Sequence, residues 1–393
     1  MSVEIDDDYV ISVVESLISH HSVSGKEDGI SRWTAGELRR LGLDVVEQEV
    51  MPGRANVIAT LDSGRPGPTL LFNGHLDTLP VQPGWSADPF TPRRVGGRLV
   101  GAEINNMKAA VGGMIGCLAA MSHDKDAMSG RIVLSAVIGE CDALGLGTTH
   151  MLHQGLKADM AINGEPTDLN VMTAHSGVSQ LRLTVQGRMV HVCQRADGRN
   201  AIEHLVTILA ALDEKALRFK PHKDFPGLPT MNVGVVRGGS MASMLAEKAE
   251  ALIDVRTVPG MTPEGVRADL EKAIGAIKAR DGSKIEAKIE LLGSPQFCQQ
   301  LPYHVTAEVP VVGTVAQSHE AVLGTPAKVG TLFPQVFYGT DASHLLHAGI
   351  PTVIYGPGKV ADINVPDESM AIADFLAAAR VYLMSAARIC ARH

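Results

Sequence analysis

The strongest constraint on the fold is an alternation of helical and strand-like apolar patterns along the first 140 residues. Residues 9–20 and 26–41 carry apolar side chains at helical spacing. Residues 56–61, 69–74 and 130–138 form short apolar runs closed by turn residues, as buried strands do. This rhythm predicts an α/β catalytic domain around a central mixed sheet.

From about residue 177 the pattern changes to strands that alternate apolar and polar residues. The segments of this part, in chain order, are the strand 178–186, the helix 201–212, the strands 231–236 and 250–256, the helix 263–280 and the strand 284–292. This order predicts a small α+β module. A chain of 393 residues is long enough for two domains. We therefore expect a catalytic domain of residues 1–176 and 293–393, interrupted by a lid and dimerisation domain of residues 177–292.

The charge and composition of the chain limit which partners and which cellular compartment we expect for the protein. A net charge of -8 and a pI near 6.0 argue against nucleic acid or an anionic membrane as partner. The N-terminal residues 1–8 are acidic, unlike a signal peptide, and the most apolar stretch, 111–121, is too short to span a bilayer. We expect a cytoplasmic protein with reduced thiols, because its cysteines are scattered and odd in number. They are Cys117, Cys141, Cys193, Cys298 and Cys390.

The most informative short motif is Gly74-His75-Leu76-Asp77-Thr78, which follows an apolar strand. Open α/β sheets place their sites at the carboxyl ends of strands. A histidine there can bind a metal, and Asp77 can hold its second ring nitrogen and fix the tautomer.

Further polar motifs follow this one along the chain. They are Asn106-Met107-Lys108, Gly139-Glu140-Cys141, Gly164-Glu165-Pro166-Thr167, His191 with Gly198-Arg199-Asn200-Ala201, Gly339-Thr340-Asp341-Ala342, Gly356-Pro357-Gly358 and Asn364-Val365-Pro366-Asp367-Glu368. In this order and spacing the motifs resemble the acetylornithine deacetylase, succinyl-diaminopimelate desuccinylase and aminoacylase family of metallohydrolases, which is similar to peptidase family M20. The resemblance runs from Ser22 to Glu368.

The resemblance implies a catalytic domain that binds two divalent metals, usually zinc. By position, His75 matches the histidine of the first metal, and Asp77 matches the residue that supports this histidine. Glu165 matches the carboxylate ligand of the first metal. Glu140 matches the general base that deprotonates the metal-bound water.

The resemblance also implies roles for the lid, which dimerises in the family. His191 matches a lid histidine that reaches a neighbouring active site and stabilises the oxyanion. Arg256 matches a position that contacts a substrate carboxylate, and Asn200 is a further candidate for substrate binding. The expected partners are a small-molecule substrate and a second copy of the chain.

Three positions depart from the family pattern. Asn106 stands where the carboxylate that bridges the two metals is expected, Cys141 replaces a carboxylate of the second metal, and Asn364 replaces its histidine. A neutral amide cannot offset the charge between two dications. We therefore predict one divalent metal per subunit, zinc or manganese, held by His75 and Glu165 with Asn106 in reach.

Two local expectations remain at these positions. Cys141 could be a zinc ligand as a thiolate, a nucleophile, or a small buried residue where a ligand was lost. The peptide bond after Asn106 is expected to be cis, as the corresponding bond is in the family.

The function predicted from these residues is hydrolysis of a C–N bond by metal-activated water, with Glu140 as general base. The substrate is a small carboxylate-bearing molecule, either an N-acyl amino acid or an aryl amine. One alternative is an aromatic aminohydrolase of the 5-nitroanthranilate type, because an electron-poor ring would carry negative charge that a second metal usually stabilises. An alternative of another class is a catalytically silent, dimeric binding protein.

Overall fold

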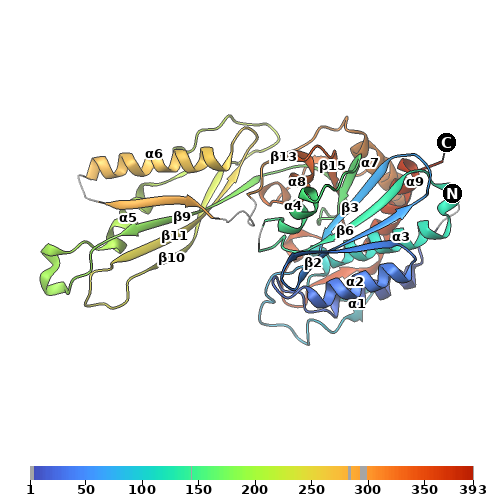
Figure 1. The fold of residues 1–393 in the computed structure, drawn as a ribbon, viewed down its shortest axis with the longest axis horizontal. Helices are drawn as coiled ribbons and strands as arrows, with labels where there is room; N and C mark the ends of the chain where they lie inside the picture. The colour runs from blue at the N-terminus through green and yellow to red at the C-terminus, as the bar shows by residue number, and fades with distance from the viewer. Residues whose placement is uncertain (1–3, 143, 282–284, 293–298, 393) are drawn as a thin grey trace. The chain divides into compact units, whose positions relative to one another are not determined.

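The computed structural model describes residues 4–142, 144–281, 285–292 and 299–392, which form two compact units (Figure 1). The first unit comprises residues 1–174, 303–335 and 340–393, and the second comprises residues 175–302 and 336–339. The domain boundary predicted at residue 293 lies outside the described residues. The predicted combination of a larger α/β unit and a smaller α+β unit is confirmed.

The first unit contains a mixed sheet with strand order β1-β2-β6-β3-β7-β15-β8-β13, and β14 pairs with β8. The strands are β1 (Asp44–Met51), β2 (Arg54–Asp62), β3 (Thr69–His75), β6 (Arg131–Val137), β7 (Met160–Asn163), β8 (Val171–His175), β13 (Tyr303–His304), β14 (Val329–Thr331) and β15 (Thr352–Ile354). Strand β3 pairs in parallel with both β6 and β7. The carboxyl ends of these three strands therefore meet at one edge of the sheet, which is where the polar motifs begin.

Helices cover both faces of this sheet. They are α1 (Asp7–Ile18), α2 (Asp28–Arg40), α3 (Ala109–His123), α4 (Leu146–His153), α7 (Pro310–Leu323), α8 (Ala342–His347) and α9 (Ile372–Ile389). On one face, Leu71 and Val133 pack with Met151 of α4 and Leu345 of α8. On the other, the ring of Phe72 meets Tyr382 of α9. Because both faces are covered, β3 and β6 are buried along nearly their whole length and carry the apolar runs Leu70–Phe72 and Ile132–Leu134.

The helix α3 is rich in alanine and glycine because it packs closely against α1. A Cβ atom at Gly112 would lie 2.4 Å from Val14, and one at Gly116 would lie 2.3 Å from Val10. Larger residues at these two positions would push the helices apart. A buried turn, Ile104–Lys108, precedes α3, and the peptide bond Asn106–Met107 within it is cis, which confirms the prediction for this bond.

A small sheet of order β16-β5-β4 also belongs to the first unit. Its strands are β4 (Arg93–Val95), β5 (Arg98–Val100) and β16 (Ser369–Ala371). It joins the segment before Asn106 to the segment after Asn364, because β5 pairs with β16. Two regions far apart in the sequence are thus brought together next to the motif residues.

The second unit is a four-stranded antiparallel sheet of order β10-β11-β9-β12 with two helices packed against it. Its elements are β9 (Gly177–Gln186), α5 (Ala201–Ala211), β10 (Thr230–Gly238), β11 (Lys248–Thr257), α6 (Pro263–Asp281) and β12 (Glu286–Leu291). The predicted order of strands and helices is confirmed. Leu181, Leu183 and Val185 are buried on alternate positions of β9, as expected for a sheet with one covered face.

Two further observations concern the whole described chain. Among the described residues, no helix combines the length and apolar character that crossing a bilayer requires. Four of the five cysteines are described and carry free thiols, namely Cys117, Cys141, Cys193 and Cys390. The fifth, Cys298, lies outside the described residues.

Candidate metal centre

The candidate centre forms around His75, the last residue of β3, which is 1% exposed. Its Nδ1 lies 2.8 Å from the main-chain oxygen of Asp77. A carbonyl oxygen only accepts, so Nδ1 carries the hydrogen and donates it. In the neutral ring, Nε2 therefore keeps its lone pair, which is the form that binds a metal.

Three oxygen-bearing side chains surround this Nε2 atom. The Oδ1 atom of Asn106 lies 3.3 Å away, Glu165 Oε1 3.5 Å and Glu140 Oε2 3.9 Å. Ligands at ~2.1 Å from a tetrahedral ion lie ~3.4 Å from one another. The distances from His75 Nε2 to Asn106 and to Glu165 are close to this spacing, so these three side chains are candidate ligands of a divalent cation.

The carboxylate of Asp77 has a different partner from the one expected. It lies 3.7 Å from His75 Nδ1 and instead accepts the main-chain N–H groups of Glu140 at 3.0 Å and Cys141 at 2.9 Å. The Ser24 hydroxyl also donates to it, at 2.9 Å. The main chain of Asp77 orients the histidine, whereas its side chain positions the segment that carries Glu140.

A buried ion pair holds the same segment from its other end. Arg54 donates to Glu27, with Nε and Oε2 2.9 Å apart, and to Asp142 at 3.2 and 3.3 Å. The Glu27 side chain is fully buried. The segment begins at Gly139, whose φ of 69° favours glycine. Glu140 and Cys141 are therefore fixed on both sides by charged groups.

Cys141 lies close to the histidine and the predicted base. The ligand atoms of His75, Glu140 and Cys141 lie within 4.8 Å of one another. Burial raises the pKa of the Cys141 thiol well above its usual value, and the carboxylates of Asp77 and Glu140 raise it further. Without a cation the group is a thiol, so its position allows metal ligation but not nucleophilic attack by itself.

The first unit concentrates negative charge at this edge of the sheet. Burial raises the pKa of Glu165 well above its usual value, and the nearby Glu140 raises it further. Burial alone would lower the pKa of His75, but Glu165, Asp77 and Asp341 outweigh burial and raise it. The pKa of Asp341 rises to about 6, mainly through burial. A divalent cation would offset this excess of carboxylates.

Glu103 is a further acidic residue of this region that the sequence analysis missed. It is 2% exposed and has a φ of 58°. Burial and the neighbouring Glu368 raise its pKa to about 8. The only available signal was a glutamate three residues before Asn106, because a positive φ cannot be predicted for glutamate from sequence.

Asn364 lies in a turn that is tied to the Asn106 segment through Glu368. The Glu368 carboxylate accepts the main-chain N–H of Asn364 at 3.1 Å, of Glu103 at 3.2 Å and of Asn105 at 2.8 Å. Glu368 therefore connects the two segments that contain the altered ligand positions.

The lid candidates belong to the second unit, where each makes local contacts. Asn200 caps α5, because its Oδ1 accepts the N–H of Ile202 at 3.1 Å. The Arg256 guanidinium pairs with Asp254, with Nε and Oδ1 2.7 Å apart, and donates to the main-chain oxygen of Phe337 at 3.2 Å. These contacts hold both side chains in place within the unit.

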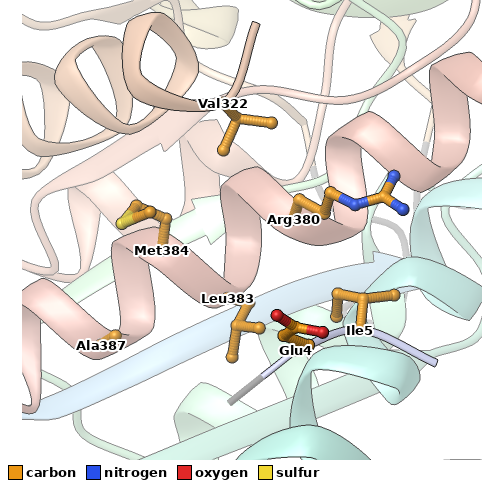
Figure 2. Close-up of a pocket in the computed structure, with 7 residues that line it drawn as sticks. All are labelled: Glu4, Ile5, Val322, Arg380, Leu383, Met384 and Ala387. Carbon is orange, nitrogen blue, oxygen red and sulfur yellow. The ribbon is translucent and has the colours of Figure 1, made fainter. Parts of the chain in front are cut away.

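A surface pocket of about 480 Å³ in the first unit contains none of these residues (Figure 2). Its lining residues are Glu4, Ile5, Val322, Arg380, Leu383, Met384 and Ala387. Arg380 of α9 also pairs with Asp7, at 2.7 Å. The chemistry-bearing residues are therefore in the buried centre and not in this pocket.

Comparison with known proteins identifies the family. Residues 71–388 match the model of peptidase family M20/M25/M40. The chain belongs to this family. It is 30% identical to an acetylornithine deacetylase of Edwardsiella ictaluri (strain 93-146), over 95% of this chain and 95% of that protein. The M20 family consists of metallohydrolases, so the family resemblance inferred from the motifs is confirmed.

Two further proteins match along nearly their whole length. An N-formyl-4-amino-5-aminomethyl-2-methylpyrimidine deformylase of Bacillus subtilis (strain 168) is 27% identical over 95% of this chain and 93% of its own. The crystal structure of an M20 metallo-carboxypeptidase from Sulfolobus solfataricus superposes with a TM-score of 0.78 at 18% identity, covering 96% of this chain and 98% of the other. The M20 fold thus extends over both units of the chain.

Proposed function

We propose that this M20 protein is a hydrolase that cleaves the C–N bond of an N-acyl amine bearing a carboxylate, with Glu140 as the general base. The observation that carries the proposal is the position of Glu140. Its carboxylate lies 3.9 Å from His75 Nε2, and its main-chain N–H is held by Asp77. A base fixed next to the metal ligands can take a proton from a water bound among them.

The proposed cofactor is one divalent ion per subunit, zinc or manganese, held by His75, Glu165 and Asn106. When bound, the ion supplies a Lewis acid that polarises the carbonyl of the substrate and lowers the pKa of water. Glu140 removes a proton from water as the oxygen adds to the carbonyl carbon. Glu140 then returns this proton to the leaving nitrogen as the C–N bond breaks.

His191 and Arg256 are proposed to act on the substrate. His191 is proposed to donate a hydrogen bond to the carbonyl oxygen as it becomes negative. Arg256 is proposed to bind the carboxylate of the substrate, and its pairing with Asp254 keeps the guanidinium in a fixed orientation. Asn200 is proposed to act indirectly, by capping the helix that follows His191.

The names of the curated relatives favour an acylated amine over an aryl amine as substrate. One relative is a deacetylase and another a deformylase, and both names describe removal of an acyl group. The aryl amine remains the second candidate. With the neutral Asn106 and Asn364 in place of ligands, the proposed site holds one metal and so supplies less positive charge than two metals do. An electron-poor ring would itself carry the negative charge that a second metal usually stabilises.

Metal analysis combined with a substrate panel tests the proposal. The purified protein should contain close to one zinc or manganese ion per chain, and it should release acid and amine from N-formyl or N-acetyl compounds. Deamination of aryl amines with no amide cleavage would favour the second candidate. A metal-free protein that turns over no member of the panel would contradict the proposal and favour a silent binding protein.

A further inference from the structure

His191 and Cys193 form a close pair in the second unit. His191 precedes a short 3₁₀ turn, Val192–Asp197, and both side chains are exposed. The His191 Nδ1 atom lies 3.1 Å from Cys193 Sγ and 3.3 Å from the main-chain nitrogen of Cys193. One ring nitrogen therefore faces two groups of the same residue.

These two contacts determine which ring nitrogen carries the hydrogen. The main-chain N–H of Cys193 can only donate, so Nδ1 must offer its lone pair. The thiol S–H can donate to the same lone pair. In the neutral imidazole, the hydrogen is then on Nε2, which faces away from Cys193 and is available as a donor.

The main chain around His191 is also fixed. His191 forms an isolated antiparallel bridge with Met244, the Val192 N–H donates to Ser243 at 3.0 Å, and the Leu245 N–H donates to Val190 at 2.9 Å. Because these hydrogen bonds fix the main chain, only the side-chain torsions determine where the His191 ring lies. The contacts with Cys193 restrict these torsions.

We infer that Cys193 is a positioning residue that holds His191 in the Nε2–H tautomer, so that Nε2 donates a hydrogen bond to the developing oxyanion. This inference rests on the role proposed above for His191. A donor already oriented before the reaction contributes more than one that must reorganise, and loss of an oxyanion donor typically costs ~10²–10³-fold in rate. The opposite tautomer would present a lone pair to the negative oxygen and repel it.

Two substitutions separate the positioning role from a merely structural one. Cys193→Ser keeps a hydrogen-bond donor at the same place. Cys193→Asp replaces the donor by a carboxylate, and a charge-assisted hydrogen bond from Nδ1–H to this carboxylate is stronger than the main-chain contact at 3.3 Å that favours a lone pair on Nδ1. Histidine ¹⁵N NMR of the full-length protein reports the protonation of each ring nitrogen, and His191→Ala identifies the signals.

The wild type and Cys193→Ser should both show hydrogen on Nε2 and none on Nδ1. Cys193→Asp should show hydrogen on Nδ1. On a substrate found with the panel, kcat of Cys193→Ser should stay within ~3-fold of wild type, whereas kcat of Cys193→Asp should fall ~10-fold or more with little change in KM.

Hydrogen on Nδ1 in the wild type would overturn the inference. So would a Cys193→Asp variant whose tautomer changes while kcat does not, or one whose tautomer is unchanged. The NMR experiment needs no substrate, so a failure of the proposed hydrolase activity is recognised separately from a failure of the tautomer assignment.

Discussion

The carboxylate of Asp77 accepts a hydrogen bond from the main-chain N–H of Glu140 at 3.0 Å. It accepts the adjacent N–H of Cys141 as well, at 2.9 Å, while the main-chain oxygen of Asp77 receives the hydrogen of His75. One residue therefore connects the proposed metal ligand to the proposed base through two different groups. Because different groups of Asp77 hold Glu140 and His75, we predict that a substitution can disturb the position of Glu140 and leave the orientation of His75 unchanged.

Asp77→Ala should lower kcat by ~10²-fold while the metal content stays near that of wild type. The side chain positions Glu140, but His75, the proposed metal ligand, is oriented by a main-chain oxygen that the substitution keeps. Elemental analysis and steady-state kinetics on the same sample measure both effects. Ser24→Ala is the matched control, because it removes one donor to the same carboxylate and should change kcat only a few-fold. Loss of the metal in Asp77→Ala would show that the carboxylate orients His75.

Arg54→Met should destabilise the fold by ~3–5 kcal/mol, because it leaves the fully buried Glu27 carboxylate without its cation. Urea unfolding of the metal-free protein measures the free energy. The double variant Glu27→Gln with Arg54→Met removes both charges and should be more stable than Arg54→Met alone. Equal stability of the single and double variants would mean that Glu27 is not held as a buried charge.

The buried Glu103 predicts an unusual dependence of stability on pH. Its pKa rises from an ordinary 4.5 to about 8 in the fold, so the folded protein binds this proton more tightly than the unfolded chain does. Stability should therefore fall as the pH rises from 5 to 8.

Glu103→Gln tests this prediction. Glutamine does not titrate, so between pH 5 and 8 the variant should lose ~3 kcal/mol less stability than the metal-free wild type loses. Some slope should remain, because the pKa of Glu368 is also raised, to about 7. Denaturant unfolding at several pH values measures the difference. Parallel curves for variant and wild type would contradict a proton bound at Glu103.

We also predict that two copies of the chain form a dimer through the edge strand of the second unit. Strand β10 pairs only with β11 within the described sheet, and Val236 on it is 56% exposed. On α5, Val206 is 58% exposed. Exposed apolar side chains beside an open strand edge favour pairing with a second copy. Light scattering should give a dimer, and Val236→Glu should shift it towards a monomer. A monomeric wild type at every concentration would exclude this interface.

Sequence patterns predicted the helices and strands of the second unit, and β2, β3 and β6 of the first, because burial determines them. Strand β3 is buried on both faces and contains a continuous apolar run, whereas β9 alternates apolar and polar residues, so each pattern reports its environment directly. Strand β1, Asp44–Met51, was not predicted, because it is a half-exposed edge strand that contains three acidic residues.

The details of the site were less accessible from sequence than the fold. Motif spacing led to His75, Glu140 and Glu165, which do lie close together. The partner of His75 was assigned to the Asp77 side chain, yet its hydrogen bond goes to a main-chain oxygen, which no residue type encodes. Glu103 was missed because its environment depends on a left-handed backbone conformation and on Glu368, 265 positions away.

The central claim is that Glu140 is the general base, and a steady-state assay of Glu140→Gln tests it most directly. Glutamine keeps the size and the main-chain contacts of Glu140 but cannot accept the proton, so kcat should fall ~10²–10⁴-fold. Metal content and thermal stability should match the wild type, and His191→Ala should cost less than Glu140→Gln. A kcat within a few-fold of wild type would mean that another group activates the water, and would contradict the account.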